Sequence, residues 1–231
     1  MCGRYTLYRS KHLATRYDLT DPSAAELIAS LNDRYNIAPS QESVVVILDD
    51  QHQPQLHLMR WGFLPPWAKD PKDIFKYKTF NARAEGIFHK PMWKTAARLH
   101  RAVIPSTGFY EWQQQADGKH PFLIAPHGED IFSFAGLYGT WRDAAGHEQQ
   151  TYSIITTRAN QDMAAIHDRM PVILSREEES LWLDPAIDDP ELLSQPLHPY
   201  PDHQLDITEV SRDVNSSRSD LASFIEPLNS K

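Results

Sequence analysis

The stretch SVVVILDDQHQPQLHLMRW, residues 43–61, decides which fold we expect for this chain. Residues 43–48 and 56–61 are rich in apolar, strand-favouring side chains, and a polar turn separates them, which predicts a β-hairpin. Working outward, further apolar runs of strand length follow along the chain. After a short apolar run at 102–104, strands are expected at residues 109–112, 121–124, 131–135 and 152–156, with an extended stretch at 171–174.

Helices are expected to be few and short. Pro22 after Asp21 suits the first turn of a helix, because proline is well tolerated at that position. The other expected helices cover residues 10–19, 91–100, 160–167 and 177–183, and residues 185–206 are expected to be irregular. Strands outnumber helices without regular βαβ alternation. We therefore predict an α+β fold of one domain, residues 1–231, with a mostly antiparallel, barrel-like central sheet and peripheral helices.

Composition narrows the class of protein. A chain of 231 residues with 41% hydrophobic side chains can bury one sizeable core. Cys2 is the single cysteine, which excludes an intramolecular disulfide and a cysteine zinc site. His198 and His203 lack a clearly spaced acidic third ligand, so we expect neither a metal nor another cofactor. No apolar run approaches the length of a membrane span and no signal peptide is visible, so a cytoplasmic protein without membrane contact is expected.

Charge is unevenly distributed along the chain. The formal net charge of −8 argues against a protein that coats DNA non-specifically. Residues 60–111, however, carry 10 basic and 4 acidic side chains, and residues 176–231 carry 4 and 13. Tryptophan, phenylalanine and tyrosine are interleaved with the cations of the basic segment, a pattern that suits single-stranded nucleic acid. Composition alone leaves a second interpretation open, in which the aromatics fill the core and the lysines solvate its rim.

Cys2 offers unusual chemistry if Met1 is removed, as is expected before a small second residue. The product carries an α-amine and a thiol on adjacent carbons, with ordinary pKa values of about 7.7–8.0 and 8.5. Such a 1,2-aminothiol can form a Schiff base with an aldehyde and then close a thiazolidine ring. The alternative is that a cysteine at this position has no role and belongs to a frayed terminus.

Three further motifs contain candidate helpers. FNARAE supplies Asn81 and Arg83, GFYEW supplies Glu111, and IHDRMP supplies His167. Burial of Glu111 between aromatics would raise the pKa of its carboxyl and suit it to proton transfer. Taken singly, each residue also has a structural explanation, as a turn asparagine, an ion-paired core glutamate or a surface histidine. The motifs of serine hydrolases, phosphate-binding loops and zinc peptidases are missing from the sequence.

Taken together, nine blocks of sequence resemble those of the SOS-response-associated peptidase (SRAP) family in order and spacing, from residue 2 to about residue 220. The blocks are MCGRY (1–5), YNIAPSQ (35–41), MRWGFLPPWAKD (59–70), FNARAE (80–85), IPSTGFYEW (104–112), FAGLY (134–138), SIITTRAN (153–160), IHDRMPVIL (166–174) and VNSSRSD (214–220).

The resemblance implies a sensor of abasic sites in single-stranded DNA that forms a covalent thiazolidine crosslink and so shields the lesion. By motif, Cys2 would be the nucleophile and Asn81 would orient the N-terminal residue and the sugar. Glu111 would assist proton transfers at the α-amine, and His167 would act as general acid and base at the sugar hydroxyl.

The resemblance also implies the DNA contacts. Arg4, Arg83 and Arg169 match positions that contact phosphates, Trp67 would stack near neighbouring bases, and Thr156 is expected to contact the DNA backbone. The expected partner is single-stranded DNA containing abasic sites, bound by a monomer without cofactor or metal.

Other activities remain open from sequence. A Schiff base at C1′ acidifies the C2′ proton, so an associated abasic-site lyase activity is compatible with Cys2. An N-terminal-nucleophile peptidase or amidohydrolase would use the same residue against a carbonyl, with its own amine as the base. A non-catalytic nucleic-acid-binding module would need only the basic, aromatic segment.

Overall fold

The hairpin predicted from the apolar runs is present. In the computed structural model, which describes residues 2–228, β3 (Glu42–Leu48) pairs antiparallel with β4 (Pro54–Trp61), with Val45 opposite His57. β3 is almost entirely buried because its valines and isoleucine lie inside the protein on both faces. The hairpin therefore forms the middle of a sheet rather than its edge.

That sheet has eight strands and is mostly antiparallel. Its order is β11-β10-β4-β3-β6-β9-β12, with β5 attached to β10, and β10 runs parallel to β4 and β5. Its other strands are β5 (Asn81–Arg83), β6 (Arg101–Ser106), β9 (Phe132–Arg142), β10 (Glu148–Arg158), β11 (Arg169–Pro171) and β12 (Ile173–Leu174).

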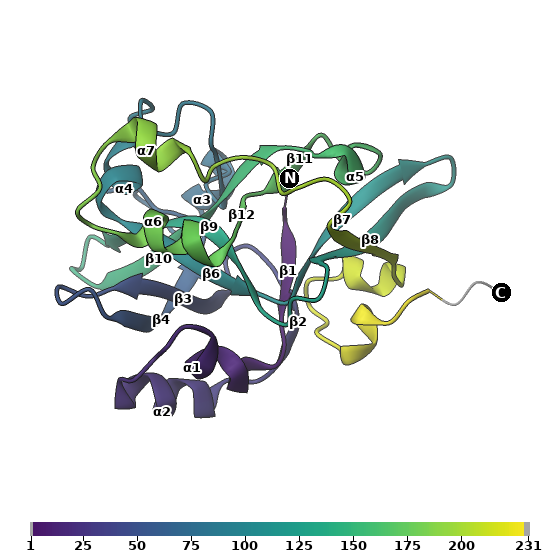
Figure 1. Ribbon diagram of the computed structural model, residues 1–231, viewed down its shortest axis with the longest axis horizontal. Helices are drawn as coiled ribbons and strands as arrows, with labels where there is room; N and C mark the ends of the chain where they lie inside the picture. The colour runs from purple at the N-terminus through teal and green to yellow at the C-terminus, as the bar shows by residue number, and fades with distance from the viewer. Residues whose placement is uncertain (1, 229–231) are drawn as a thin grey trace.

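A second sheet of five strands carries the start of the chain. Its order is β13-β8-β7-β1-β2, so β1 lies between β7 and β2, with Arg4 opposite Tyr110 and Tyr5 opposite Ile37. β1 runs through the middle of the molecule (Figure 1). The strands are β1 (Arg4–Leu7), β2 (Arg34–Ile37), β7 (Gly108–Gln115), β8 (Gly118–Pro126) and β13 (Leu205–Glu209).

Helices lie at the periphery of the two sheets (Figure 1). They are α1 (Leu13–Arg16), α2 (Pro22–Ser30), α3 (Asp73–Tyr77), α4 (Lys94–Leu99), α5 (Gln161–Ala164), α6 (Arg176–Leu183) and α7 (Pro190–Ser194), with 3₁₀ turns η1 (Ser10–His12), η2 (Arg212–Asn215) and η3 (Ala222–Ile225). Asp21 caps α2 by accepting from the Ser23 amide, as expected for a chain that enters a helix through Asp-Pro. Within residues 2–228, no helix is long and apolar enough to cross a membrane.

Both sheets pack on one main core, and its centre is aromatic. Trp61 stacks on Tyr152 with ring centroids 6.3 Å apart, and Tyr5 meets Trp61 edge to face at 5.1 Å. The Tyr5 and Tyr152 hydroxyls lie 2.7 Å apart, so the polar ends of two fully buried rings satisfy each other. The predicted α+β class with a mostly antiparallel, barrel-like sheet is confirmed.

Several elements differ from the prediction. The helix expected over residues 10–19 is reduced to η1 and α1, and the tail expected to be irregular contains α7 and the first two residues of β13. β1, β2 and β5 were not predicted, because strands of three or four residues with mixed polarity show no clear period of two. Two of these unpredicted elements, β1 and β5, position the candidate site.

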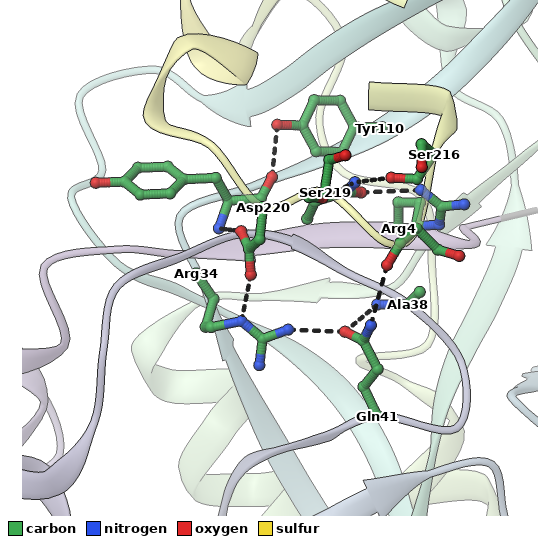
Figure 2. A network of polar contacts seen from close by, with 11 residues as sticks. Arg4, Arg34, Ala38, Gln41, Tyr110, Ser216, Ser219 and Asp220 are labelled. Carbon is green, nitrogen blue, oxygen red and sulfur yellow. Dashed lines mark hydrogen bonds and ion pairs between the residues drawn. The ribbon is translucent and has the colours of Figure 1, made fainter. Parts of the chain in front are cut away.

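The C-terminal segment 214–220 is tied to β1 and β2 by a polar network (Figure 2). The fully buried Asn36 amide donates to the carbonyls of Val214, Ser216 and Ser219 at 3.2, 2.9 and 2.8 Å. Its Oδ1 accepts from Arg4 Nη1 at 2.9 Å, which connects the network to β1.

The network continues at Asp220. Its carboxylate accepts from the Tyr35 amide at 2.6 Å and from the Arg34 guanidinium (Figure 2). The network thus joins residues near the two ends of the sequence beside β1, the strand that follows Cys2.

We expect Asn36→Ala to lower the free energy of unfolding by about 2 kcal/mol, because it leaves buried carbonyls and a guanidinium without their partner. Urea denaturation of both proteins measures the difference. Asn32→Ala is the matched control, since Asn32 is exposed four residues earlier. Equal stability of the two variants would contradict a structural role for the Asn36 network.

Candidate active site

Cys2 lies directly before β1 and is fully buried among the described residues. Its carbonyl accepts a hydrogen bond from Asn81 Nδ2 at 2.7 Å, and its Sγ lies 3.8 Å from the Arg4 carbonyl oxygen. The terminus is therefore not frayed. The bond from Asn81 fixes the backbone beside the thiol.

Asn81 owes its place to β5, a strand of three residues. β5 runs parallel to β10, with Asn81 opposite Ile154, and the residue before it is held by a bond from Trp61 Nε1 to the Phe80 carbonyl at 2.8 Å. Asn81 is only 7% exposed. Within residues 2–228, its Oδ1 is buried and has no hydrogen-bond partner. One side of this amide holds Cys2 and the other offers an acceptor.

Glu111 reaches the site from β7, the strand that pairs with β1. The residue is only 2% exposed, and burial raises the pKa of its carboxyl, while the nearby charge of His167 acts in the opposite direction. The structure thus agrees with the expectation of a desolvated carboxyl between aromatics. A carboxyl with a raised pKa is suited to exchanging protons near neutral pH.

The Cys2 thiol differs from the expectation of partial ionisation near neutral pH. Burial raises the pKa of this thiol well above its usual range, and the charge of Glu111 raises it further. Burial therefore favours the neutral thiol over the thiolate in the folded chain. The sulfur becomes a strong nucleophile only when a base takes its proton or a positive charge develops beside it.

His167 belongs to the turn that follows α5, and its side chain is 30% exposed. Its amide donates to the Met163 carbonyl at 2.9 Å. Its Nδ1 lies 3.0 Å from the Arg169 amide and 2.8 Å from Asp168 Oδ1. Nδ1 accepts from an amide only when unprotonated and donates to a carboxylate only when protonated. Nδ1 therefore makes one of these two hydrogen bonds at a time, depending on which ring nitrogen carries a hydrogen.

The predicted arginine contacts are placed differently from one another. Arg83 is exposed beside Asn81, as a phosphate contact requires. Arg4 donates three hydrogen bonds, to Asn36 Oδ1 and to the carbonyls of Val214 and Asn215, at 2.9, 2.9 and 3.2 Å. It therefore has a structural function in addition to any contact with DNA.

Arg169 and Thr156 lie further inside than expected for DNA contacts. The Arg169 guanidinium is 11% exposed, binds both oxygens of Glu85 at 2.6 and 3.0 Å and donates to the Thr156 carbonyl at 2.6 Å. Thr156 is fully buried on β10, so its side chain is not available at the surface. Sequence reasoning missed Glu85, although it stands in the FNARAE block two residues after Arg83.

The aromatic residues of the basic segment divide into a buried and an exposed set. Trp61 and Trp93 are buried in the core, whereas Trp67, Phe75 and Tyr77 are 53%, 53% and 42% exposed. Lysines at positions 69, 72 and 76 are exposed between these last three aromatic residues in the sequence, and the exposed Lys78 follows them. A surface with both cations and aromatic faces thus leads along the chain to Asn81.

The described residues contain no group of three or more histidine, cysteine, aspartate or glutamate side chains arranged to hold a metal ion.

Comparison with known proteins agrees with the resemblance seen in the sequence. The sequence model of the family described as SOS response associated peptidase (SRAP) matches residues 1–217. The abasic site processing protein YoqW of Bacillus subtilis is 39% identical over 227 residues, covering 98% of this chain and 99% of the relative. The abasic site processing protein YedK of Escherichia coli is 30% identical and covers 99% and 100%.

A crystal structure of a protein from Bacteroides thetaiotaomicron has the same fold, with a TM-score of 0.87 at 28% identity over 99% of this chain and 100% of that one. The family match spans both sheets and the motifs that contain Cys2, Asn81, Glu111 and His167. The chain therefore belongs to the SOS response associated peptidase (SRAP) family.

Proposed function

We propose that this protein processes abasic sites in single-stranded DNA by joining to them covalently through Cys2. The observation that carries the proposal is the position of Asn81, whose amide holds the Cys2 carbonyl on one side and presents a buried, unpartnered Oδ1 within residues 2–228 on the other. Relatives named abasic site processing proteins, similar over nearly the whole chain, support the same substrate.

The reaction begins after removal of Met1, which frees the α-amine of Cys2. The amine attacks the C1′ aldehyde of the ring-opened sugar, and loss of one water leaves a protonated Schiff base. The thiol sulfur then attacks the same carbon, forming the C–S bond as the C=N double bond becomes single. The thiol proton leaves to a base, so the thiazolidine and one water are the products.

The surrounding groups fit these steps. Glu111, with its raised pKa, can take a proton from the amine or thiol and stabilise the positive iminium. The His167 side chain is 30% exposed and can move a proton at the sugar hydroxyl as the ring opens. Asn81 Oδ1 can accept from a sugar hydroxyl. The iminium charge would also favour ionisation of the neighbouring thiol, which burial keeps neutral beforehand.

An abasic-site lyase activity follows from the same intermediate. The Schiff base acidifies the C2′ proton, and a base that removes it leads to β-elimination of the 3′ phosphate and strand scission. Ring closure by the thiol competes with this elimination, so the balance between crosslink and scission depends on how fast the sulfur attacks.

Intact-mass analysis before and after incubation with an abasic single-stranded oligonucleotide tests the proposal. We expect the free protein to lack Met1, and the product to have the mass of protein plus oligonucleotide less one water. Absence of an adduct would sink the proposal, and turnover of peptide or amide substrates without DNA would favour hydrolysis instead.

Trp67→Ala should weaken non-covalent binding of single-stranded DNA about tenfold, because stacking on one aromatic face contributes about 1–3 kcal/mol per base. Fluorescence anisotropy with an oligonucleotide containing a non-reactive abasic analogue measures the dissociation constant. Leu99→Ala is the control, since Leu99 is 67% exposed outside this surface. An equal affinity of both variants would show that Trp67 does not contact the strand.

A further inference from the structure

Glu111 and His167 reach the candidate site from different sheets, so something must set their separation. Glu111 lies on β7 in the five-stranded sheet, whereas the His167 turn connects α5 to β11 in the eight-stranded sheet. A hydrogen bond crosses between the two: Gln113 Nε2 donates to the Ala165 carbonyl at 2.9 Å. Gln113 is two residues from Glu111, and Ala165 is two residues from His167.

On the β7 side, the donor is held in one orientation. Residues 111, 113 and 115 point to the same face of the strand, since side chains alternate. Gln115 Nε2 donates to Gln113 Oε1 at 2.8 Å. Because that bond occupies the amide oxygen of Gln113, the amide nitrogen is directed toward Ala165. Gln114 points to the opposite face and is exposed.

On the side of the His167 turn, the acceptor is the Ala165 carbonyl, which needs a donor from outside α5. Ala165 is the C-cap of α5, where the helix supplies no further amide for its carbonyls. The turn itself is anchored within its own sheet, by the amides of Ile166 and His167 on the Met163 carbonyl and by the Ala159 amide on the Asp168 carbonyl. Gln113 adds an anchor from the opposite sheet.

We infer that Gln113 is a positioning residue that holds the His167 turn in register with Glu111 during the reaction. The inference rests on the proposed function for its kinetic consequence. Proton transfer and ring closure depend steeply on geometry, whereas the bond lies near the surface and contributes little to overall stability. Its loss should therefore affect the rate more than the binding of DNA or the fold.

Gln113→Met tests this, since methionine keeps the length of the side chain and cannot donate. With an abasic single-stranded oligonucleotide and saturating protein, we expect the first-order rate of adduct formation to fall about 3- to 10-fold. The half-saturating protein concentration and the melting temperature should not change. Gln114→Met, on the opposite face, should match the wild type, and Gln115→Ala should fall between them.

A second measurement does not depend on adduct formation. Hydrogen–deuterium exchange of residues 163–168 should become about 3- to 10-fold faster in Gln113→Met and stay unchanged in Gln114→Met. Unchanged exchange in Gln113→Met, or equal rates in the two variants, would overturn the inference. Absence of any adduct with the wild type would overturn the proposed function alone, because the exchange comparison would still decide the role of Gln113.

Discussion

Cys2→Ala is expected to abolish the heat-stable adduct with abasic single-stranded DNA, a loss of at least about 100-fold. Alanine is also small enough for Met1 to be removed, so the α-amine remains and can still form a Schiff base. Borohydride should therefore trap an adduct with Cys2→Ala, and strand scission should persist or increase. Denaturing gels with and without borohydride distinguish the two kinds of product.

The single cysteine of the chain provides a control for this substitution. Cys2 is the one cysteine of the chain, so a thiol-reactive reagent labels the unfolded wild type and leaves Cys2→Ala unlabelled. A heat-stable adduct formed by Cys2→Ala without borohydride would show that the thiol is not needed and that the bond to DNA is of another kind.

His167→Asn is expected to slow adduct formation about 100-fold without changing DNA affinity, because a general acid and base typically contributes a factor of about 10²–10⁴. Asparagine is chosen since its Oδ1 can replace Nδ1 as the acceptor for the Arg169 amide, now at 3.0 Å. The turn is then kept while the titratable ring is removed. Single-turnover rates at saturating protein measure the effect.

His127→Asn provides a matched comparison. His127 also lies beside a carboxylate, with its Nε2 3.3 Å from Asp206 Oδ1, but it directly follows β8 in the other sheet. We expect it to react at the wild-type rate. Equal rates for the two asparagine variants would remove His167 from the chemistry.

Much of the fold could be predicted because its large strands carry their signal locally. The β3–β4 hairpin, β6 to β10 and the Asp-Pro start of α2 all follow from runs of apolar residues and from capping. β1 and β5 could not be predicted in this way. Each becomes a strand only because distant partners, β7 and β10, supply its hydrogen bonds.

The candidate site, like the fold, can be predicted only in part from local sequence. Motifs identify Cys2, Asn81, Glu111 and His167 as residues, but not what holds them. The bond between Asn81 and Cys2 joins positions 79 residues apart, and the bond between Gln113 and Ala165 joins positions 52 apart. Nor does the sequence reveal that Arg169 is ion-paired with Glu85, since Arg169 on β11 and the segment after β5 come together only because both strands pair with β10. Local motifs name the chemistry, and long-range pairing orients it.

The order in which β1 and its partner β7 are synthesised has a consequence for how the protein is made. In the proposed reaction Met1 is removed first, and the described structure shows Cys2 fully buried where β1 pairs with β7. β7 begins at Gly108, and the segment that ties Arg4 in place begins near Val214. At about 5–20 residues per second on the ribosome, several seconds pass between the synthesis of β1 and the synthesis of its partner β7. The topology thus leaves the start of the chain unpaired with β7 during the interval in which the proposed removal of Met1 would take place, and Cys2 is enclosed afterwards.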